Sequence, residues 1–266
     1  MATLLLKKSY QIKTLKEIPF QDLWGNHGVF TTMRLIGKPL KIIFLKNHLK
    51  NIINSSKAYN IYKVNLLNNL KKILKYNLII NRSYNHLLRL AITKDVVSIS
   101  IRRRLSPDKD FKLKFYRHKR EKAQHKNLNY KKILKNMKKI NTKKYDLALI
   151  NKNRIYETGT ANLLFIKNNK IYSPKDNFYK GITLKYISKQ IKINFKDILI
   201  KNLKDYDEII LVGSGKGIVA ATKIEEIKWA RKSTKYFKLL KNLYKTAVTK
   251  CPLYYSWSIN LTILQI

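Results

Sequence analysis

The apolar positions in the amino-terminal half of the chain are spaced partly as in strands and partly as in helices. Alternating or continuous apolar runs predict strands over residues 27–36, 40–45, 87–93 and 96–104. Apolar positions three and four residues apart predict helices over residues 47–61 and 65–76. Turns are expected at Gly37-Lys38-Pro39 and Lys94-Asp95. This pattern predicts a small α+β lobe over residues 1–115.

The carboxyl-terminal half is richer in short strands. Residues 116–125 are polar, basic and without periodicity, so we interpret them as a linker. The strands predicted beyond it span 146–151, 154–157, 162–167, 170–174 and 208–214. Helices are predicted over 132–140, from Gly181 with Thr183 as N-cap, and over 233–250. The sequence therefore predicts an α/β protein of two domains, the second of which, residues 126–266, is larger and β-rich with some helices; no element is predicted for its apolar end.

Composition limits the class of protein. The chain has 266 residues, of which 45% are hydrophobic, enough to bury two adjoining cores. No stretch of about 18 uncharged apolar residues occurs, and the first apolar run is too short for a signal peptide, so we expect a soluble protein without a membrane partner. The single cysteine, Cys251, excludes an internal disulfide and a CxxC metal site. We therefore expect a cytoplasmic protein without a metal ion.

The formal net charge of +42 raises the question of nucleic-acid binding. Lysines are spread along nearly the whole chain among Asn and Ile, whereas a nucleic-acid footprint usually concentrates them in one stripe or tail. We interpret the charge as a compositional bias of the source organism, and we do not expect nucleic acid as a partner. The densest basic segment, residues 102–122, is interpreted as a solvated face near an anionic substrate entrance.

Three segments of the second half contain candidate chemical groups. Lys126 lies in HKNLNY, and Glu157, one of 15 acidic residues, lies at a strand end before Thr-Gly-Thr. Residues 181–183 open a helix, where free backbone N–H groups suit a phosphate, and residues 213–215 form an amide-rich turn that suits an anion. A nucleotide phosphate loop is excluded because Gly follows Lys216, where that motif needs Ser or Thr. Each signal alone is more often an ordinary structural feature.

The order of these segments resembles the class IV (fold type IV) pyridoxal-phosphate enzymes, which include branched-chain and D-amino-acid aminotransferases and aminodeoxychorismate lyase. The family's Lys motif, K-x-L-N, corresponds to Lys126-Asn127-Leu128-Asn129, and its later motifs correspond to D-x-A-L at 146–149, E-T-G-T-A-N-L-L-F at 157–165, G-I-T at 181–183 and G-S-G-K-G-I at 213–218. In the first half, G-V-F-T-T-M-R at 28–34 and His48-Leu49 match two further family segments. The resemblance covers roughly residues 25 to 225.

This resemblance implies a two-domain fold type IV enzyme whose second domain binds pyridoxal 5'-phosphate. It implies that Lys126 holds the cofactor and later moves the proton at the substrate carbon. Glu157 would face the pyridine nitrogen and keep it protonated. Thr32 would lie near a small, amino-acid-like substrate, and the enzyme would be a homodimer.

The resemblance also implies which groups hold the cofactor phosphate. The backbone amides of Ile182 and Thr183, the hydroxyls of Thr183 and Ser214 and the amide of Gly215 would surround it. The chain departs from the family at Asn51, where an arginine usually contacts this phosphate. The neighbouring Lys50 cannot take the same place because it points about 100° away around the helix.

Within the family, the short chain and the VFTTMR segment look most like aminodeoxychorismate lyase, which releases pyruvate from 4-amino-4-deoxychorismate to give 4-aminobenzoate. Branched-chain aminotransferases more often carry F-E-x-x-R and a longer chain. The first alternative is a branched-chain or D-amino-acid aminotransferase that uses 2-oxoglutarate. The second is a basic nucleic-acid-binding protein on a degenerate scaffold, which would cluster lysines with exposed aromatic residues.

Overall fold

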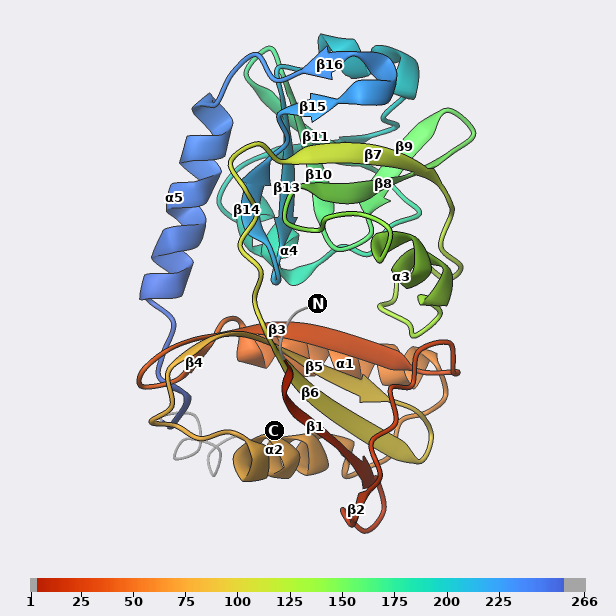
Figure 1. Cartoon of the computed structure of the whole chain (residues 1–266), viewed down its shortest axis with the longest axis vertical. Helices are drawn as coiled ribbons and strands as arrows, with labels where there is room; N and C mark the ends of the chain where they lie inside the picture. Colours follow the sequence, from red (N-terminus) through yellow and green to blue (C-terminus); the bar gives the residue numbers. More distant parts are fainter. Residues whose placement is uncertain (1–3, 256–266) are drawn as a thin grey trace. The chain divides into compact units, whose positions relative to one another are not determined.

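The computed structural model describes residues 4–255, and its contacts divide the chain into two compact units (Figure 1). The described residues of the first unit are 4–104, 126–129 and 247–255, and those of the second are 105–125 and 130–246. The first unit thus ends its main run at Arg104, earlier than the boundary near residue 115 that the apolar pattern predicts. Part of the predicted linker forms β7 (Lys112–Arg117), a strand of the second unit. Residues 256–266 of the apolar end lie outside the described residues.

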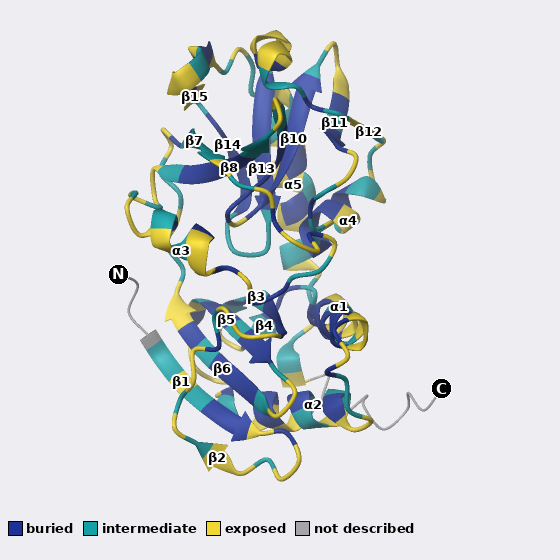
Figure 2. Ribbon diagram, turned by 90° about the vertical axis from the view of Figure 1, so that its right-hand side faces the viewer, coloured by how far each residue is buried: buried dark blue, intermediate teal, exposed yellow. Residues whose placement is uncertain are grey.

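The first unit is built on an antiparallel sheet with the strand order β2-β1-β6-β5-β3-β4. Its strands are β1 (Leu4–Gln11), β2 (Glu17–Ile18), β3 (Val29–Gly37), β4 (Lys41–Ile42), β5 (Tyr84–Ile92) and β6 (Val96–Arg103). The helices α1 (Leu45–Ala58) and α2 (Leu66–Asn77) cover one face of the sheet and bury their apolar stripes against it (Figure 2). Met33 of β3, Ile52 of α1 and Leu70 of α2 share this core.

The predicted strand over residues 40–45 is wrong beyond Ile42. Only Lys41–Ile42 pairs with β3, and Phe44 has a left-handed backbone, with φ of 58°, that turns the chain into α1. The structure also contains β1, which the apolar pattern did not predict because Lys7 and Lys8 interrupt its apolar run. Pairing with both β2 and β6 makes β1 an interior strand.

Residues 250–255 belong to the first unit. They follow α5 (Lys235–Thr249), the predicted closing helix. The amide of Tyr254 donates to the carbonyl of Leu40 at 2.8 Å, and Lys41 Nζ donates to the carbonyl of Thr249 at 3.1 Å. The turn between β3 and β4 is thereby attached to the carboxyl-terminal segment.

The second unit contains two sheets that share one core. Their strand orders are β12-β11-β10-β13-β14 and β16-β15-β7-β8-β9. The strands not yet located are β8 (Tyr145–Asn151), β9 (Arg154–Thr158), β10 (Asn162–Lys167), β11 (Lys170–Pro174), β12 (Ile193–Lys196), β13 (Glu208–Gly213), β14 (Gly217–Ala220), β15 (Lys223–Ile224) and β16 (Trp229–Ala230). Phe165 of β10, Leu113 of β7 and Trp229 of β16 lie in the same buried cluster.

Helices and turns complete the second unit. The helical segments are α3 (Lys131–Met137), α4 (Ile182–Ser188), η1 (Ile200–Asp205) and η2 (Glu225–Ile227), besides α5. Turns with positive φ follow β8, at Lys152-Asn153, and β10, at Asn168-Asn169; Asn adopts this conformation more readily than most residues. Within residues 4–255 no helix has the length and apolar character needed to cross a bilayer.

Candidate active site

The segment that carries Lys126 is held against the beginning of β3. The amide of Phe30 donates to the Lys126 carbonyl at 2.8 Å, and Val29 and Asn127 form an antiparallel bridge. The amide of Leu128 donates to the carbonyl of Gly28 at 2.9 Å. The close approach requires a glycine at position 28, because a Cβ there would lie 2.7 Å from Leu128 Cδ1 and 2.3 Å from a backbone oxygen of β5. The glycine at position 28 thus allows the backbone hydrogen bonds that hold the candidate cofactor lysine against β3.

The side chain of Lys126 lies near an aromatic ring and a buried imidazole of the first unit. Its Nζ is 5.1 Å from the centroid of the Phe30 ring. His48 is fully buried and hydrogen bonded to Thr31, with 2.7 Å between Nδ1 and Oγ1. Burial, and then the positive charge of Lys126, lower the pKa of His48 to about 3, so this imidazole is neutral at neutral pH. Thr32, the predicted substrate contact, alternates with Thr31 and therefore lies on the Phe30 face of β3.

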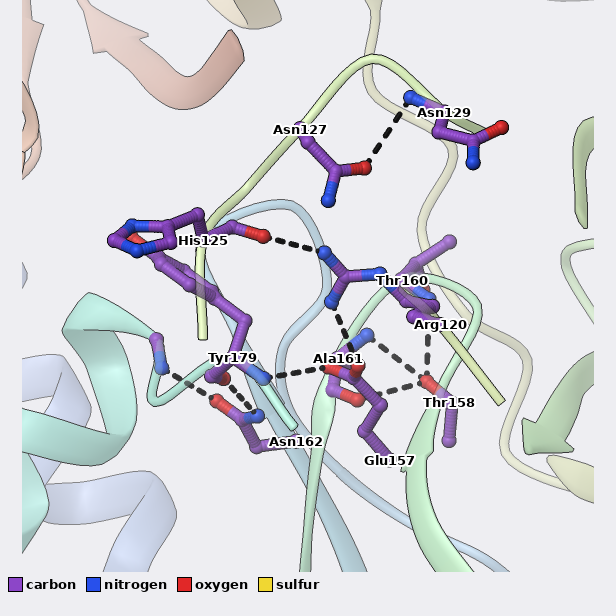
Figure 3. Close-up of polar contacts among 11 residues, drawn as sticks. Arg120, His125, Asn127, Asn129, Glu157, Thr158, Thr160, Ala161, Asn162 and Tyr179 are labelled. Carbon is purple, nitrogen blue, oxygen red and sulfur yellow. Dashed lines mark hydrogen bonds and ion pairs between the residues drawn. The ribbon is translucent and has the colours of Figure 1, made fainter. Parts of the chain in front are cut away.

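In the second unit, Glu157 forms a buried ion pair that the motif comparison did not identify. Arg120 Nη1 donates to Glu157 Oε1 at 2.7 Å, with 2% and 6% of the two side chains exposed (Figure 3). Arg120 Nη2 donates to the carbonyl of His125 at 2.6 Å, and the guanidinium lies 5.0 Å from the ring centroid of Tyr130. Arg120 thus supplies the opposite charge that a buried carboxylate requires.

Sequence context gave no signal for Arg120. It lies among Arg117, Lys119 and Lys122, all of which are exposed, and shares their charge. Only burial distinguishes it from them. Burial depends on tertiary packing, so a single sequence without alignment cannot identify this residue.

The side chain of Asn162, the first residue of β10, connects this strand to the beginning of α4. Its Nδ2 donates to the carbonyl of Tyr179 at 2.6 Å, and its Oδ1 accepts from the amide of Gly181 at 2.9 Å (Figure 3). The amide of Tyr179 in turn lies 3.4 Å from Glu157 Oε2. A side chain at position 181 would collide with Asn162, since a Cβ would lie 2.6 Å from Oδ1. Glu157 and the start of α4 are therefore brought together.

The helix start differs from the prediction in one respect. Gly181 is the N-cap residue, with extended backbone, and Ile182 is the first helical residue, so the predicted N-cap role of Thr183 is wrong. Thr183 instead lies in the first turn with its side chain pointing inward. It is 1% exposed, and Oγ1 has no hydrogen-bond partner among the described residues. A buried hydroxyl of this kind calls for an acceptor from outside the protein.

The turn with Ser214 and Gly215 joins β13 to β14 next to the same group. Val212, two residues before Ser214, pairs with Asn162 across β10 and β13. A Cβ at Gly213 would lie 3.2 Å from that of Ala161. The predicted residues Glu157, Ile182, Thr183, Ser214 and Gly215 therefore gather at one edge of the second unit.

A buried carboxylate also supports this edge. Asp146 is fully buried on β8 and accepts hydrogen bonds from the hydroxyls of Thr158 at 2.9 Å and Thr160 at 2.5 Å. Lys216 Nζ lies 3.8 Å from Asp146 and 3.5 Å from the carbonyl of Thr142. Asp146 thus connects the segment after Glu157 with the turn that carries Ser214. Among residues 4–255, His, Cys, Asp and Glu side chains form no group of three or more that would hold a metal ion.

Comparisons with known proteins agree with these segments. The sequence profile of Amino-transferase class IV matches residues 28–224, more than half of the chain. No curated protein matches the chain in sequence.

Solved structures share the fold at low sequence identity. The branched-chain aminotransferase of the thermophilic archaeon Thermoproteus uzoniensis, with norvaline, is 16% identical, with a TM-score of 0.76 over 94% of this chain and 97% of its own. A hypothetical aminotransferase from Mycobacterium tuberculosis, in its pyridoxal-phosphate-bound form, is 12% identical, with a TM-score of 0.70 over 91% and 99%. A candidate 4-amino-4-deoxychorismate lyase from Legionella pneumophila is 23% identical, with a TM-score of 0.66 over 83% and 91%.

The family match covers both the Lys126 segment and the edge around Glu157. The mixed α/β structure agrees with the fold type IV architecture of the solved aminotransferases. The chain therefore belongs to the class IV aminotransferase family and is a pyridoxal-phosphate-dependent enzyme, an aminotransferase or a lyase.

Proposed function

We propose that this enzyme is an aminodeoxychorismate lyase, which converts 4-amino-4-deoxychorismate to 4-aminobenzoate and pyruvate. The observation that carries the proposal is the Val29–Arg34 segment of β3. Branched-chain aminotransferases more often have F-E-x-x-R here. This chain has Thr31 in place of the acidic residue, and Thr31 is buried and hydrogen bonded to His48. The fold shared with the candidate Legionella lyase supports the same assignment.

The residues of the second unit fit pyridoxal phosphate. The buried hydroxyl of Thr183 lacks an acceptor among the described residues, and a phosphate oxygen would supply one. The backbone amides of Ile182 and Thr183, with Ser214 and Gly215, would complete the phosphate contacts. Glu157, kept charged by Arg120, is the carboxylate that would face the pyridine nitrogen.

Lys126 has two roles in the proposed reaction. Bound pyridoxal phosphate supplies an electron sink for negative charge at the carbon that carries the substrate amine. Lys126 would hold the cofactor, and once the substrate amine has taken its place, the Lys126 Nζ would accept the proton from that carbon. The bond between the ring and the enolpyruvyl oxygen would break with its electron pair going to that oxygen, and the ring would become aromatic. The released enolate would take up a proton at its methylene carbon to become pyruvate, which balances the proton removed by Lys126. Thr32 would orient the substrate beside this amine.

The decisive experiment supplies 4-amino-4-deoxychorismate to the cofactor-loaded enzyme without any keto acid. Formation of 4-aminobenzoate, followed by chromatography with fluorescence detection, is expected for the wild type. Lys126→Ala should form none, whereas Lys119→Ala, a change at an exposed lysine of the same segment, should keep the wild-type rate. Absence of 4-aminobenzoate in the loaded wild type would contradict the lyase assignment.

The same preparation tests the alternatives. A branched-chain or D-amino-acid aminotransferase would produce glutamate from an amino acid and 2-oxoglutarate, and the fold shared with the Thermoproteus enzyme favours this second candidate. A nucleic-acid-binding protein would instead give a tight, sequence-dependent gel shift at physiological salt without cofactor. We also propose a homodimer, which light scattering during gel filtration would detect.

A further inference from the structure

A chain of aromatic and cationic side chains leads from β5 to the amine of Lys126. We propose that Phe30, supported by Trp24 and Arg89, is a positioning residue that holds this amine in place. The inference deepens the proposed function, since it rests on Lys126 as the lysine that holds the cofactor.

Three successive contacts make up the chain. Lys126 Nζ lies over the Phe30 ring at 5.1 Å from its centroid. Trp24 meets Phe30 with a centroid distance of 4.7 Å and an interplanar angle of 80°, an edge-to-face arrangement typical of stable aromatic pairs. The Arg89 guanidinium lies 4.5 Å from the Trp24 ring centroid, and 13% of the Arg89 side chain is exposed. Each member therefore limits the movement of the next.

Arg89 is itself anchored at both ends. It projects from β5, where it pairs with Thr32 of β3 and Ser100 of β6. Its guanidinium forms an ion pair with the carboxylate of Asp22 and donates to the Asp22 carbonyl at 3.3 Å. Asp22 lies two residues before Trp24, so this contact fixes the segment that carries the indole.

Buried serine side chains hold the same segment onto the sheet. The hydroxyls of Ser9 and Ser98 are 2.8 Å apart, and both residues are at most 1% exposed. The amide of Gln21 donates to Ser9 at 2.9 Å, while Ser98 donates to the carbonyl of Gln21 at 2.7 Å. At the other end, the Gly25 amide donates to the carbonyl of Leu128 at 2.8 Å. Residues 21–25 are thus attached to the strands and to the Lys126 segment.

This arrangement suits what a cofactor lysine must do. The lysine side chain is a flexible four-carbon stem with a compact charge, so an unsupported amine would sample many positions. A ring face attracts the ammonium form electrostatically, and it offers no strong acceptor that would compete with covalent bond formation. Phe30 therefore gives the amine a defined place before the cofactor binds and after the substrate displaces it.

The test compares Phe30→Leu, which keeps an apolar side chain but removes the ring face, with Phe30→Tyr, which keeps the ring. Cofactor-free protein at neutral pH is treated with isotope-labelled acetic anhydride, and acetylation at Lys126 is measured by peptide mass spectrometry. We expect Phe30→Leu to raise the Lys126 rate about two- to fivefold, which corresponds to about 0.5–1 kcal/mol for a cation–π contact. Phe30→Tyr should match the wild type. Phe20→Leu is the matched control, because it removes the ring beneath a different lysine, Lys7, whose Nζ lies 5.5 Å from the ring centroid.

A second readout follows attachment of the cofactor. Pyridoxal phosphate is added, the bond is reduced with borohydride at timed intervals, and the labelled Lys126 peptide is counted. We expect slower attachment in Phe30→Leu than in Phe30→Tyr, and Trp24→Leu should show the same defects in smaller degree.

The outcomes separate this inference from the proposed function. An unchanged Lys126 acetylation rate in a folded Phe30→Leu protein, or equal defects in the Leu and Tyr variants, would overturn it. If Phe30→Leu does not fold, a Trp24→Leu rate equal to the wild type overturns it equally. Failure of the lyase assay alone would contradict the proposed function. It would not affect the conclusion about Phe30, since the acetylation measurement uses neither cofactor nor substrate.

Discussion

Replacing Arg120 with methionine tests how far the second unit depends on its buried ion pair. The substitution removes the 2.7 Å contact with Glu157 and the 2.6 Å contact with the His125 carbonyl. Methionine is long and flexible enough to fill much of the vacated space, so the main change is electrostatic. Glu157, with 6% of its side chain exposed, would then be buried without its cationic partner.

The expected loss in the free energy of unfolding is about 3–5 kcal/mol, the usual effect of removing one partner from a buried ion pair. A second substitution, Glu157→Gln, removes the isolated charge, so the double variant should recover about 2 kcal/mol or more of that loss.

Urea unfolding of the cofactor-free protein, followed by circular dichroism, measures these differences. Arg154→Met is the matched control: Arg154 pairs with Asp197 at 3.1 Å, but 39% and 28% of these side chains are exposed. An exposed pair of this kind contributes about 0–1 kcal/mol. If Arg120→Met were no more destabilising than Arg154→Met, the argument from burial would be refuted.

Three further changes have definite expected results. Burial first, and the charge of Lys126 second, lower the pKa of His48 to about 3. Between pH 6.5 and 3 only the unfolded chain therefore takes up this proton, so the free energy of unfolding decreases as the pH is lowered. Between pH 7 and pH 5 the wild type should lose about 2 kcal/mol more than His48→Gln, as measured by urea unfolding at the two pH values. Equal losses would contradict the neutral state of His48. Thr183→Val removes a buried hydroxyl that has no partner among the described residues, so the Tm without cofactor should stay the same or rise. The increase in Tm on adding pyridoxal phosphate should become smaller than in the wild type. An equal increase in both proteins would exclude the phosphate contact. Gly28→Ala would place a Cβ 2.3 Å from the Ile92 carbonyl oxygen, and should cost about 3 kcal/mol in urea unfolding, whereas a loss near zero would mean that the Lys126 segment can move aside.

The fold could be predicted wherever apolar spacing was regular. The helices found at 45–58 and 66–77 lie close to the ranges read from their apolar stripes, because an amphipathic helix records its buried face in its own sequence. The strands β15 and β16 have two residues each, too few to show an apolar pattern in the sequence. They exist because distant partners pair with them, as β7 does with β15, and a local window does not contain those partners.

The candidate site divides in the same way. Lys126 and Glu157 could be proposed because they stand in an ordered set of motifs, and the family match covers both positions. Arg120 and Trp24 stand in no such motif, although each contacts a side chain next to the proposed chemistry. Their importance comes from burial and from contacts between distant parts of the sequence, which residue spacing does not indicate. Arg120 in particular is one of 57 Lys and Arg residues.

The contacts of Thr249 and Tyr254 with the β3–β4 turn have a consequence for biosynthesis. Residues 4–104 are synthesised first, but Lys126, the backbone partner of Phe30, is made later, and Tyr254, which donates to Leu40, is made after residue 246. By then every residue of the second unit has already been made. The first unit is therefore the last to acquire all of its contacts. A nascent protein stalled before residue 247 would contain every residue of the second unit but would lack residues 247–255 of the first.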